Sequence, residues 1–234
     1  AKWGGLPNRC LFDNENDIKN YLHNVYDSII LRDVVKNLNL KDTVLFDMIL
    51  QYLIETTGRE FSPENLVNYF NSQNRKISKE TIYTYVDGLC KALILKKVYR
   101  YDIAGKSVLK KINKYYATDL GIAQIKNNNP EFKSYIVLEN IVYNELILRG
   151  YEVYIGKTKN GEVDFLAKKD GITKYIQVTY ELNGNENAIE REFGAYKYIN
   201  DNNPKYVISL DKIDLSRNGI IHLNLIDFLL GDNF

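Results

Sequence analysis

The sequence has few of the residues that build disulfide frameworks, zinc sites or histidine-dependent active sites. Its 234 residues include two cysteines, Cys10 and Cys90, and two histidines, His23 and His222. The cysteines give neither a disulfide framework nor the spacing of zinc ligands. The histidines have no partner at ligand or triad spacing, so we expect no Ser/His or Cys/His catalytic site. These scarcities fit a reducing, cytoplasmic compartment.

Long apolar runs and a strong net charge are also missing. No run approaches the length of a transmembrane helix and no signal-peptide pattern is present, so we expect no membrane partner. The formal net charge is +1. The residues up to Pro130 carry 19 Lys and Arg against 14 Asp and Glu, whereas the remainder carries 12 against 16. A mildly basic first part permits contact with nucleic acid without requiring it.

Apolar periodicity predicts two regions in the first part of the chain. Residues 1–41 read as a helical linker region, with apolar residues at helical spacing from about Asn14 to Lys36. Residues 42–126 read as three helices followed by a β-hairpin, a winged helix-turn-helix. The predicted helices are Val44–Thr56, one that begins at Ser62-Pro63-Glu64, and one from Ser78 to about Leu93. The predicted strands are Leu95–Tyr101 and Asn113–Thr118, joined across Ile103-Ala104-Gly105-Lys106.

The third predicted helix would be the one that reads a DNA groove. The candidate nucleic-acid-binding residues are Lys79, Thr81, Tyr83, Lys96, Lys97 and Lys106. Further basic residues around the predicted wing are Lys91, Arg100, Lys110, Lys111 and Lys114. Strong DNA-reading helices usually present Arg, Asn or Gln outward, and this helix does not. Binding of double-stranded DNA and a protein–protein role therefore both stay open.

The pattern changes after the break at Asn127-Asn128-Asn129-Pro130. Residues 131–234 are predicted to follow the order α-β-β-β-α-β. The expected helices are Ser134–Arg149, ending at Gly150, Glu186–Asp201, and a last helix that ends at Leu230. The expected strands are Glu152–Ile155, Glu162–Lys168, Thr173–Tyr180, Tyr206–Leu210 and Ile220–Leu223.

Asp170-Gly171 is typical of a two-residue hairpin turn. With that turn, cross-strand partners have residue numbers that sum to 341, so Asp164 is expected opposite Gln177. Thr179 would share their face of the strand.

Three oxygen-bearing side chains could meet beside this hairpin. Glu139 stands in an apolar helical stripe, where a carboxylate needs a donor, a metal or solvent. Aimed at Asp164 and Gln177, it would complete a ligand set for Mg²⁺ or Mn²⁺ that could activate water at a phosphodiester. The alternative is that Glu139 is a satisfied helix carboxylate and that the other two are a cross-strand polar pair.

These residues carry a family resemblance. Glu139, Gly161-Glu162-Val163-Asp164-Phe165 and Ile176-Gln177-Val178-Thr179-Tyr180 resemble the motif of the PD-(D/E)XK nuclease superfamily. More closely, nearly the whole chain resembles the C-terminal domain of unknown function of prokaryotic AAA-type ATPases. The segments that carry this second resemblance are Trp3-Gly4-Gly5-Leu6-Pro7, Leu31-Arg32-Asp33, Glu139-Asn140-Ile141-Val142-Tyr143-Asn144-Glu145-Leu146, Arg149-Gly150-Tyr151 and Arg191-Glu192-Phe193.

The resemblance implies an α+β or α/β protein, with a helical winged helix-turn-helix region followed by a restriction-endonuclease-like core. It implies a metal site of Glu139, Asp164 and Gln177, and an upstream ATPase module as partner. ATP would bind to that upstream module. Gly105-Lys106-Ser107 resembles the end of a P-loop, but Arg100 stands where the first glycine of that motif would be, so these residues form no nucleotide site.

One residue departs from the nuclease motif, because Thr179 stands where the family has lysine. A threonine supplies no positive charge, and losing electrostatic stabilisation of a transition state costs orders of magnitude in rate. Lys197 and Arg191 are candidate substitutes on the following helix. We therefore expect an accessory region of the ATPase, for nucleic-acid handling or scaffolding, with weak or absent nuclease activity. The alternatives are an active Mg²⁺- or Mn²⁺-dependent DNA endonuclease and a protein-interaction module that touches no nucleic acid.

Overall fold

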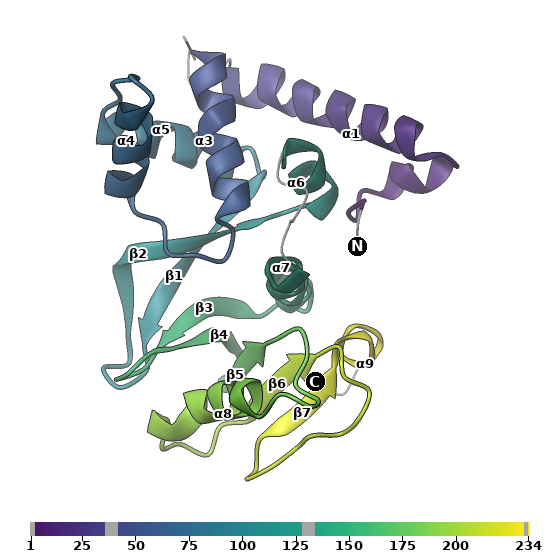
Figure 1. Cartoon of the computed structure of the whole chain (residues 1–234), viewed down its shortest axis with the longest axis vertical. Coiled ribbons are helices and arrows are strands. Elements are labelled where there is room, and N and C mark those ends of the chain that lie inside the picture. The colour runs from purple at the N-terminus through teal and green to yellow at the C-terminus, as the bar shows by residue number, and fades with distance from the viewer. Residues whose placement is uncertain (1–2, 36–41, 128–133, 232–233) are drawn as a thin grey trace. The chain divides into compact units, whose positions relative to one another are not determined.

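The computed structural model describes residues 3–35, 42–127, 134–231 and 234. It is a mixed α/β protein with a seven-stranded mixed sheet, and it divides into two compact units. The first unit is Ala1–Lys97 with Lys114–Phe132, and the second is Val98–Asn113 with Lys133–Phe234. Figure 1 shows the helices and strands of each. None of the described helices is both long and apolar enough to cross a lipid bilayer.

The first unit is mainly helical, and side chains that cap helix N-termini fix where its helices begin. Its helices are η1 (Pro7–Leu11), α1 (Glu15–Ile29), the π-helical η2 (Ile30–Val35), α3 (Thr43–Glu55), α4 (Pro63–Ser72), α5 (Lys79–Lys91) and α6 (Leu120–Lys126). Each α-helix of the unit has a capping side chain that accepts a backbone N–H of its first turn. The caps are Asn14, Asp42, Ser62, Ser78 and Asp119.

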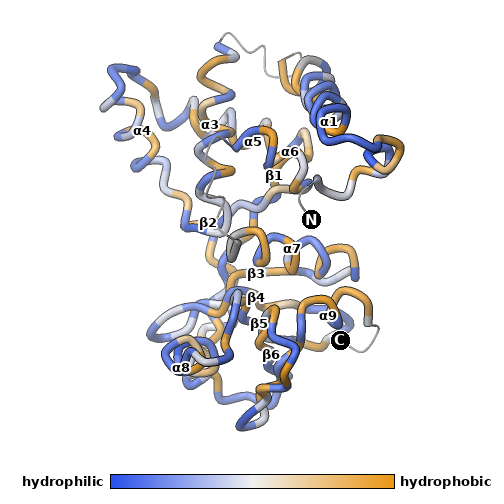
Figure 2. Tube along the Cα trace, turned by 45° about the vertical axis from the view of Figure 1, so that its right-hand side comes forward, coloured by the Kyte–Doolittle hydropathy of each residue, from blue (hydrophilic) through white to orange (hydrophobic). Residues whose placement is uncertain are grey.

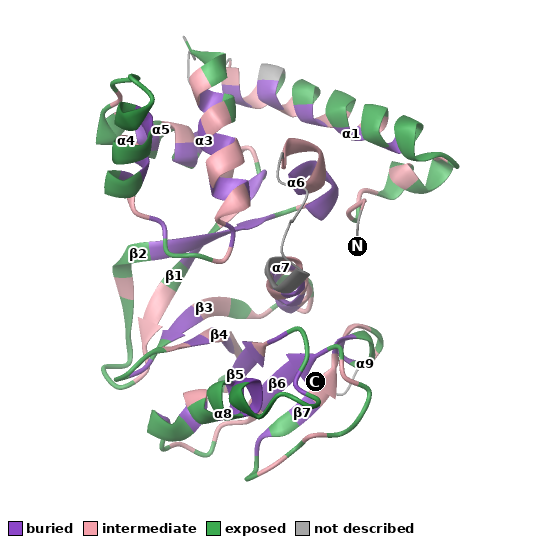
Figure 3. Cartoon of the chain, viewed as in Figure 1, coloured by how far each residue is buried: buried purple, intermediate pink, exposed green. Residues whose placement is uncertain are grey.

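The core of this unit lies where α3, α4 and α5 meet. Its fully buried residues include Ile49 and Leu53 of α3, Phe70 of α4, and Ile82 and Leu89 of α5. Figure 3 shows that α1 buries only isolated positions along one side. Three helices in the predicted order therefore enclose one hydrophobic cluster.

A β-hairpin follows these helices, as the sequence predicts. Strands β1 (Leu95–Asp102) and β2 (Ser107–Ala117) are neighbours in the sheet, joined by the four-residue turn at residues 103–106. The second strand is longer than predicted, so Lys110 and Lys111 lie in β2 and not in a loop. Helix α6 was not predicted. Asp119 caps it, and it buries Leu120, Ile122 and Ala123. The end of the predicted linker helix at Lys36 lies outside the described residues, as does most of the predicted boundary at 127–130.

The second unit contains helices α7 (Ser134–Leu148), α8 (Glu186–Gly194), η3 (Ala195–Tyr198) and α9 (Leu225–Leu230). Its strands are β3 (Glu152–Lys157), β4 (Glu162–Lys169), β5 (Ile172–Val178), β6 (Lys205–Ser209) and β7 (Ile221–Asn224). The elements follow the predicted order, but the predicted helix Glu186–Asp201 ends as α8 at Gly194 and is followed by η3. Gly150 ends α7 with φ of 81°, a left-handed conformation that favours glycine.

The sheet mixes parallel and antiparallel neighbours. Its strand order is β2-β1-β3-β4-β5-β6-β7. The pairs β3–β4 and β4–β5 are antiparallel, whereas β1–β3, β5–β6 and β6–β7 are parallel. The three central strands β3, β4 and β5 are thus antiparallel to their neighbours within this group, and a parallel pair follows on each side of it.

The β4–β5 turn has the predicted geometry. Asp170 and Gly171 have φ values of 50° and 78°, and the flanking residues Lys169 and Ile172 pair directly. Phe165 pairs with Ile176, so the residue numbers of partners sum to 341 as expected. Next to this last pair, the backbone N–H of Asp164 donates to the side chain of Gln177.

A β-bulge interrupts β4 at Asp164. Tyr154 of β3 pairs with Leu166, whereas Gly156 pairs with Val163, so three steps along β4 match two along β3. The extra residue of β4 falls at Asp164–Phe165. Val163 and Leu166 would lie on opposite faces of a regular strand, yet both are buried in the same hydrophobic cluster. The bulge makes this shared orientation possible.

Helices cover both faces of this part of the sheet. The cluster that contains Val163 packs β4, β5 and β6 against α8 and η3 through Ile189, Phe193 and Tyr196. On the other face, Tyr143 of α7 packs on Phe165 with ring centroids 6.0 Å apart. Figure 2 shows the hydrophobic residues along α7 and the strands.

Candidate functional site

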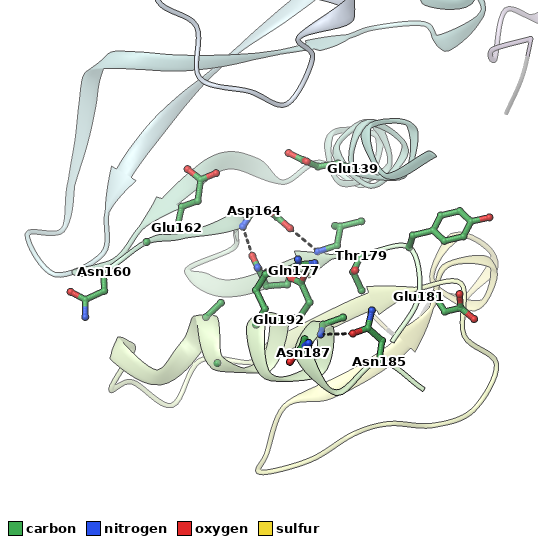
Figure 4. Close-up of a pocket in the computed structure, with 17 residues that line it drawn as sticks. Glu139, Asn160, Glu162, Asp164, Gln177, Thr179, Glu181, Asn185, Asn187 and Glu192 are labelled. Atoms are coloured by element: carbon green, nitrogen blue, oxygen red, sulfur yellow. Dashed lines mark hydrogen bonds and ion pairs between the residues drawn. The ribbon is translucent and has the colours of Figure 1, made fainter. Parts of the chain in front are cut away.

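A pocket of about 1080 Å³ lies in the second unit, beside the bulge of β4, the end of β5 and the start of α8. It is lined by Glu139, Asn160, Gly161, Glu162, Asp164, Gln177, Val178, Thr179, Tyr180, Glu181, Asn185, Asn187, Ala188, Arg191, Glu192, Gly194 and Ala195. The pocket brings together Glu139, Asp164 and Gln177, the three side chains that the sequence singles out, together with Thr179 (Figure 4).

Asp164 and Gln177 bind each other's strands. The side-chain Oε1 of Gln177 accepts the backbone N–H of Asp164 at 2.6 Å, and the Oδ2 of Asp164 accepts the backbone N–H of Val178 at 2.8 Å. At the bulge the regular ladder is interrupted, and these side chains satisfy two backbone donors there. The cross-strand polar pair is therefore part of what holds β4 to β5.

Glu192 of α8 is a member of this network that the sequence predictions did not include. Its Oε2 accepts the side-chain N–H of Gln177 at 2.9 Å, and its Oε1 accepts two bonds from the guanidinium of Arg191, at 2.6 and 2.8 Å. The Glu192 side chain is buried, whereas that of Arg191 is 71% exposed. The spacing of Ala188, Glu192 and Phe193, which share the buried face of α8, is the sequence signal that could have identified it.

The other predicted members of the site are placed differently. Glu139 of α7 is half-buried and lines the pocket, as does Arg191. Lys197, proposed as a substitute for the missing lysine, is exposed on η3 and lines a different depression, with Phe193, Asp201 and Lys205. The predicted continuous helix ends at Gly194, and the 3₁₀ helix η3 follows it. Lys197 therefore does not have the direction that a continuous α-helix would give it.

The oxygen atoms of the pocket do not form a cluster of acidic metal ligands. Within the described ranges, no three side chains of His, Cys, Asp or Glu are grouped so that they could hold a metal ion. Binding of Mg²⁺ or Mn²⁺ by Glu139, Asp164 and Gln177 stays a prediction.

Thr179 lies just past the end of β5, where its backbone N–H donates to the carbonyl of Ile208 at 3.0 Å. Its side chain is 6% exposed and lines the pocket.

A second buried polar network contains His222, and here the prediction that His222 has no partner at triad spacing is wrong. The Oγ of Ser209 lies 2.8 Å from Nε2 of His222 and donates to Asp211 at 2.7 Å. The Nδ1 of His222 accepts the backbone N–H of Leu215 at 3.4 Å. Ser209 is fully buried, and its hydroxyl donates a hydrogen bond to Asp211. The hydroxyl is therefore not deprotonated by His222, and the network provides no activated serine nucleophile.

Burial lowers the pKa of His222, against the opposing effect of Asp211 and Asp214. Burial alone would raise the pKa of Asp211, but hydrogen bonds from the backbone of Leu182, from Ser209 and from the backbone of Asn183 together lower it. The network therefore holds an ionised Asp211 and a neutral His222 at neutral pH. Through Leu182 it also anchors the segment that borders the pocket.

Two of the candidate nucleic-acid-binding residues of the first unit are engaged in bonds within the protein. Lys79 pairs with Glu64, and the backbone N–H of Thr81 binds the cap Ser78. Lys91 pairs with Asp87 at 2.7 Å. The outward face of α5 therefore holds its lysines in ion pairs, which reduces the positive charge available to phosphates.

Other candidate residues remain accessible. Tyr83 is 55% exposed, Lys97 is exposed and Lys96 is half-buried, all in the first unit. In the second unit, Lys106, Lys110 and Lys111 are exposed on the outer part of the hairpin.

Two residues of the predicted basic wing do not contribute charge to an accessible surface. Lys114 is buried. Arg100 pairs with Glu162 at 2.7 Å. The prediction that both supply basic charge around the wing is wrong.

With this geometry in place, comparison with known proteins assigns a family. A family's sequence pattern matches residues 2–131, more than half of the chain. The chain belongs to the family described as a domain of unknown function (DUF8612). The matched segment covers the described helices of the first unit and the hairpin, whereas the pocket of this DUF8612 chain lies beyond it.

Relatives cover the pocket as well. An uncharacterized protein of Haemophilus influenzae is 31% identical over 230 residues, covering 98% of this chain and 56% of its own length. An uncharacterized protein of Methanocaldococcus jannaschii is 33% identical over 219 residues, covering 92% of this chain and 47% of its own length. The chain thus spans about half the length of these curated relatives. A crystal structure of a Vibrio cholerae protein aligns with 80% of this chain and 55% of that one, at 10% identity and a TM-score of 0.26.

Proposed function

We propose that this DUF8612 chain is an accessory region of a prokaryotic AAA-type ATPase. In this proposal, a winged-helix first unit handles nucleic acid or scaffolds a partner, and the second unit is a nuclease-like domain without catalytic activity. The segments that resemble the C-terminal domain of such ATPases support it. The length of the relatives also supports the proposal. This chain covers 56% and 47% of their length, so each has room for a further module of similar size.

The architecture of each unit is consistent with this proposal. Along the chain, α3, α4 and α5 of the first unit precede the hairpin β1–β2, the order of a winged helix-turn-helix. In the second unit, the order α7-β3-β4-β5-α8-β6 is that of the nuclease-like core, with Asp164 on its second strand and Gln177 on its third. Fold alone does not establish an activity, so the argument depends on the pocket.

The proposed loss of catalysis rests on one observation: the polar side chains of Asp164 and Gln177 are already engaged in hydrogen bonds within the protein. Asp164 and Gln177 each accept a backbone N–H of the opposite strand, and Gln177 is also held by the buried Glu192. The position that would supply a cation is Thr179. Arg191, the one cation among the lining residues, is paired with Glu192. With threonine at the position of the family's lysine and Arg191 paired with Glu192, we expect weak stabilisation of transition-state charge on a phosphodiester.

A calorimetric titration with Mn²⁺, run together with cleavage of supercoiled plasmid DNA, tests this proposal. The proteins are the wild type, Asp164→Ala, Glu139→Gln and, as a matched control outside the pocket, Glu190→Gln, which removes an exposed carboxylate of α8. We expect no Mn²⁺-dependent cleavage above the level of Asp164→Ala. Cleavage by the wild type that is lost in both pocket variants and kept in Glu190→Gln would overturn the proposal and favour an active endonuclease.

A further inference from the structure

Exposed lysines gather at one edge of the sheet in the second unit, on the turn between β1 and β2 and on the loop between β3 and β4. They are Lys106, Lys110, Lys111, Lys157 and Lys159. Because β1 and β3 are parallel, with Asp102 paired to Lys157, their carboxyl ends meet at this edge. The backbone N–H of Ile103 donates to the carbonyl of Lys157 at 3.1 Å, so the turn and the loop are in contact. Figure 1 shows these two connections side by side.

The protein itself does not neutralise the charge of these lysines. Among the residues that the structure describes, none forms an ion pair or a hydrogen bond with any of the five ammonium groups. The same two segments, residues 100–111 and 157–162, contain two carboxylates. Glu162 pairs with Arg100 at 2.7 Å, and Asp102 accepts the backbone N–H of Gly105 at 3.2 Å. The edge therefore presents five positive charges to solvent, which attract a polyanion.

Protection of an edge strand explains only part of this pattern. Strand β2 is at the edge of the sheet, where lysines discourage pairing with another chain, and Lys110 and Lys111 fit that role. Lys106, however, lies in a turn. Lys157 and Lys159 belong to β3, which has a neighbouring strand on both sides, and to the loop that follows it. These three lysines therefore need another explanation.

We propose that this edge binds the phosphate backbone of duplex DNA without sequence preference. The inference rests on the proposed handling of nucleic acid and assigns it to a surface of the second unit. Strands β2, β1 and β3 are consecutive in the sheet, so their ends lie within about 10 Å of one another. Duplex DNA carries one negative charge per about 1.7 Å of its axis, so a surface of this width faces several phosphates.

The residue types of the two connections favour phosphates over bases. Residues 103–111 and 157–161 contain no aromatic residue and no arginine. Aromatic side chains are the platforms on which single-stranded bases stack, and arginine forks read guanine in a groove. Lysine is a compact point charge that suits a phosphate oxygen. The composition therefore fits a duplex held by its backbone.

The loop between β3 and β4 also borders the candidate pocket. Asn160 and Gly161 of this loop line the pocket, and Figure 4 shows Asn160 on it. A duplex held by Lys157 and Lys159 would therefore pass beside the nuclease-like pocket of the same unit.

Fluorescence anisotropy of the full chain with a labelled DNA duplex of mixed sequence, measured over a range of salt concentrations, tests the proposal. If all five lysines contact phosphates, the logarithm of the binding constant falls against the logarithm of salt concentration with a slope of about −4.5. Lys106→Gln and Lys159→Gln each remove one charge, one from each connection. Each should reduce the magnitude of the slope by about 0.9, and the double variant by about 1.8.

Lys169→Gln is the matched control, because it removes one exposed charge at the opposite edge of the sheet. Lys168, its neighbour, pairs with Glu152 at the start of β3, whereas Glu162 pairs with Lys157 at its end. The ammonium of Lys169 donates to the carbonyl of Arg149 at 2.7 Å, and a glutamine can donate there too. The slope and the affinity of this variant should equal those of the wild type.

Equal losses in all three single variants would indicate diffuse charge attraction and overturn the proposal. Labelled poly-glutamate that binds as tightly as the duplex, and is lost in the same variants, would overturn it in favour of an acidic protein partner. Duplex binding that neither Lys106→Gln nor Lys159→Gln changes would overturn this inference and leave nucleic-acid handling by another surface intact. Absence of duplex binding by the wild type at low salt would remove nucleic-acid handling from the proposed function as well.

Discussion

The substitution Gln177→Glu would place a second carboxylate directly against the buried Glu192. In the wild type, the amide N–H of Gln177 donates to Glu192 at 2.9 Å. A glutamate at this position can still accept the backbone N–H of Asp164, and its size is nearly the same. Its second oxygen, however, faces a carboxylate that is only 5% exposed. The substitution therefore replaces one hydrogen bond by a like-charge contact and changes little else.

The variant can respond in two ways: both carboxylates stay charged and repel each other, or one of them is protonated. The less costly response sets the expected loss of unfolding free energy. Two charges about 3 Å apart repel by about 5 kcal/mol at an effective dielectric constant of about 20. Relative to the unfolded chain, in which a glutamate has a reference pKa of about 4.3, keeping one of the two carboxyls protonated costs about 4 kcal/mol at pH 7 and about 1 kcal/mol at pH 5. Protonation is less costly at both pH values, and it restores a donor between the two groups. The loss of unfolding free energy should thus be about 4 kcal/mol at pH 7 and about 1 kcal/mol at pH 5.

Urea unfolding followed by circular dichroism, at pH 5 and at pH 7, measures this difference. Trp3, the single tryptophan, lies in the first unit, so its fluorescence would not report on the pocket. Asn187→Glu is the matched control, because it adds a carboxylate to the same pocket at an exposed position of α8 and should change stability by no more than about 0.5 kcal/mol. A Gln177→Glu variant as stable as the wild type at pH 7, or equally destabilised at both pH values, would refute the proposed contact with Glu192.

Two further predictions concern other parts of the chain. Because burial lowers the pKa of His222, the unfolded state binds more protons below its ordinary pKa of about 6.5, so His222 stabilises the fold above that pH and the stability is lost as the pH falls. His222→Gln should flatten urea-unfolding stability between about pH 6.5 and pH 5, and an unchanged slope would contradict the assignment. If the hairpin lysines contact duplex DNA, Lys110→Ala/Lys111→Ala should weaken salt-dependent binding in fluorescence anisotropy, whereas Lys79→Ala, whose side chain already pairs with Glu64, should have a smaller effect. Equal losses in both, or no binding of the wild type at low salt, would contradict this.

Much of the second unit could be predicted because its local signals are strong. The alternation of apolar residues marks the strands, and Asp170-Gly171 selects a two-residue turn that fixes the register of β4 on β5. From that register follows the meeting of Asp164 and Gln177. The same reasoning missed the bulge. Residues 163–167 are all buried or half-buried, so they show no regular alternation that would reveal an extra residue.

The residues that were missed depend on contacts between distant segments. Glu192 could be placed on the buried face of α8 from helical spacing, but its pairing with Gln177 requires the packing of α8 on the sheet. His222 finds Ser209 because β6 and β7 are parallel neighbours, and it finds Leu215 because of the path of the loop between them. Neither the neighbour in a parallel sheet nor the path of a long loop is encoded in local periodicity.

The bulge at Asp164 also limits how this segment of the chain can vary. Loss of one residue there would restore an uninterrupted strand, and either Val163 or Leu166 would then turn out of the hydrophobic cluster that both now share. Exposing one such side chain costs about 1.5–3 kcal/mol, a large part of the net stability of a typical domain. Single-residue deletions in β4 should therefore be rare among functional descendants of this sequence. Packing of Val163 and Leu166 would then keep the direction of the Asp164 carboxylate, even if that carboxylate had no function of its own.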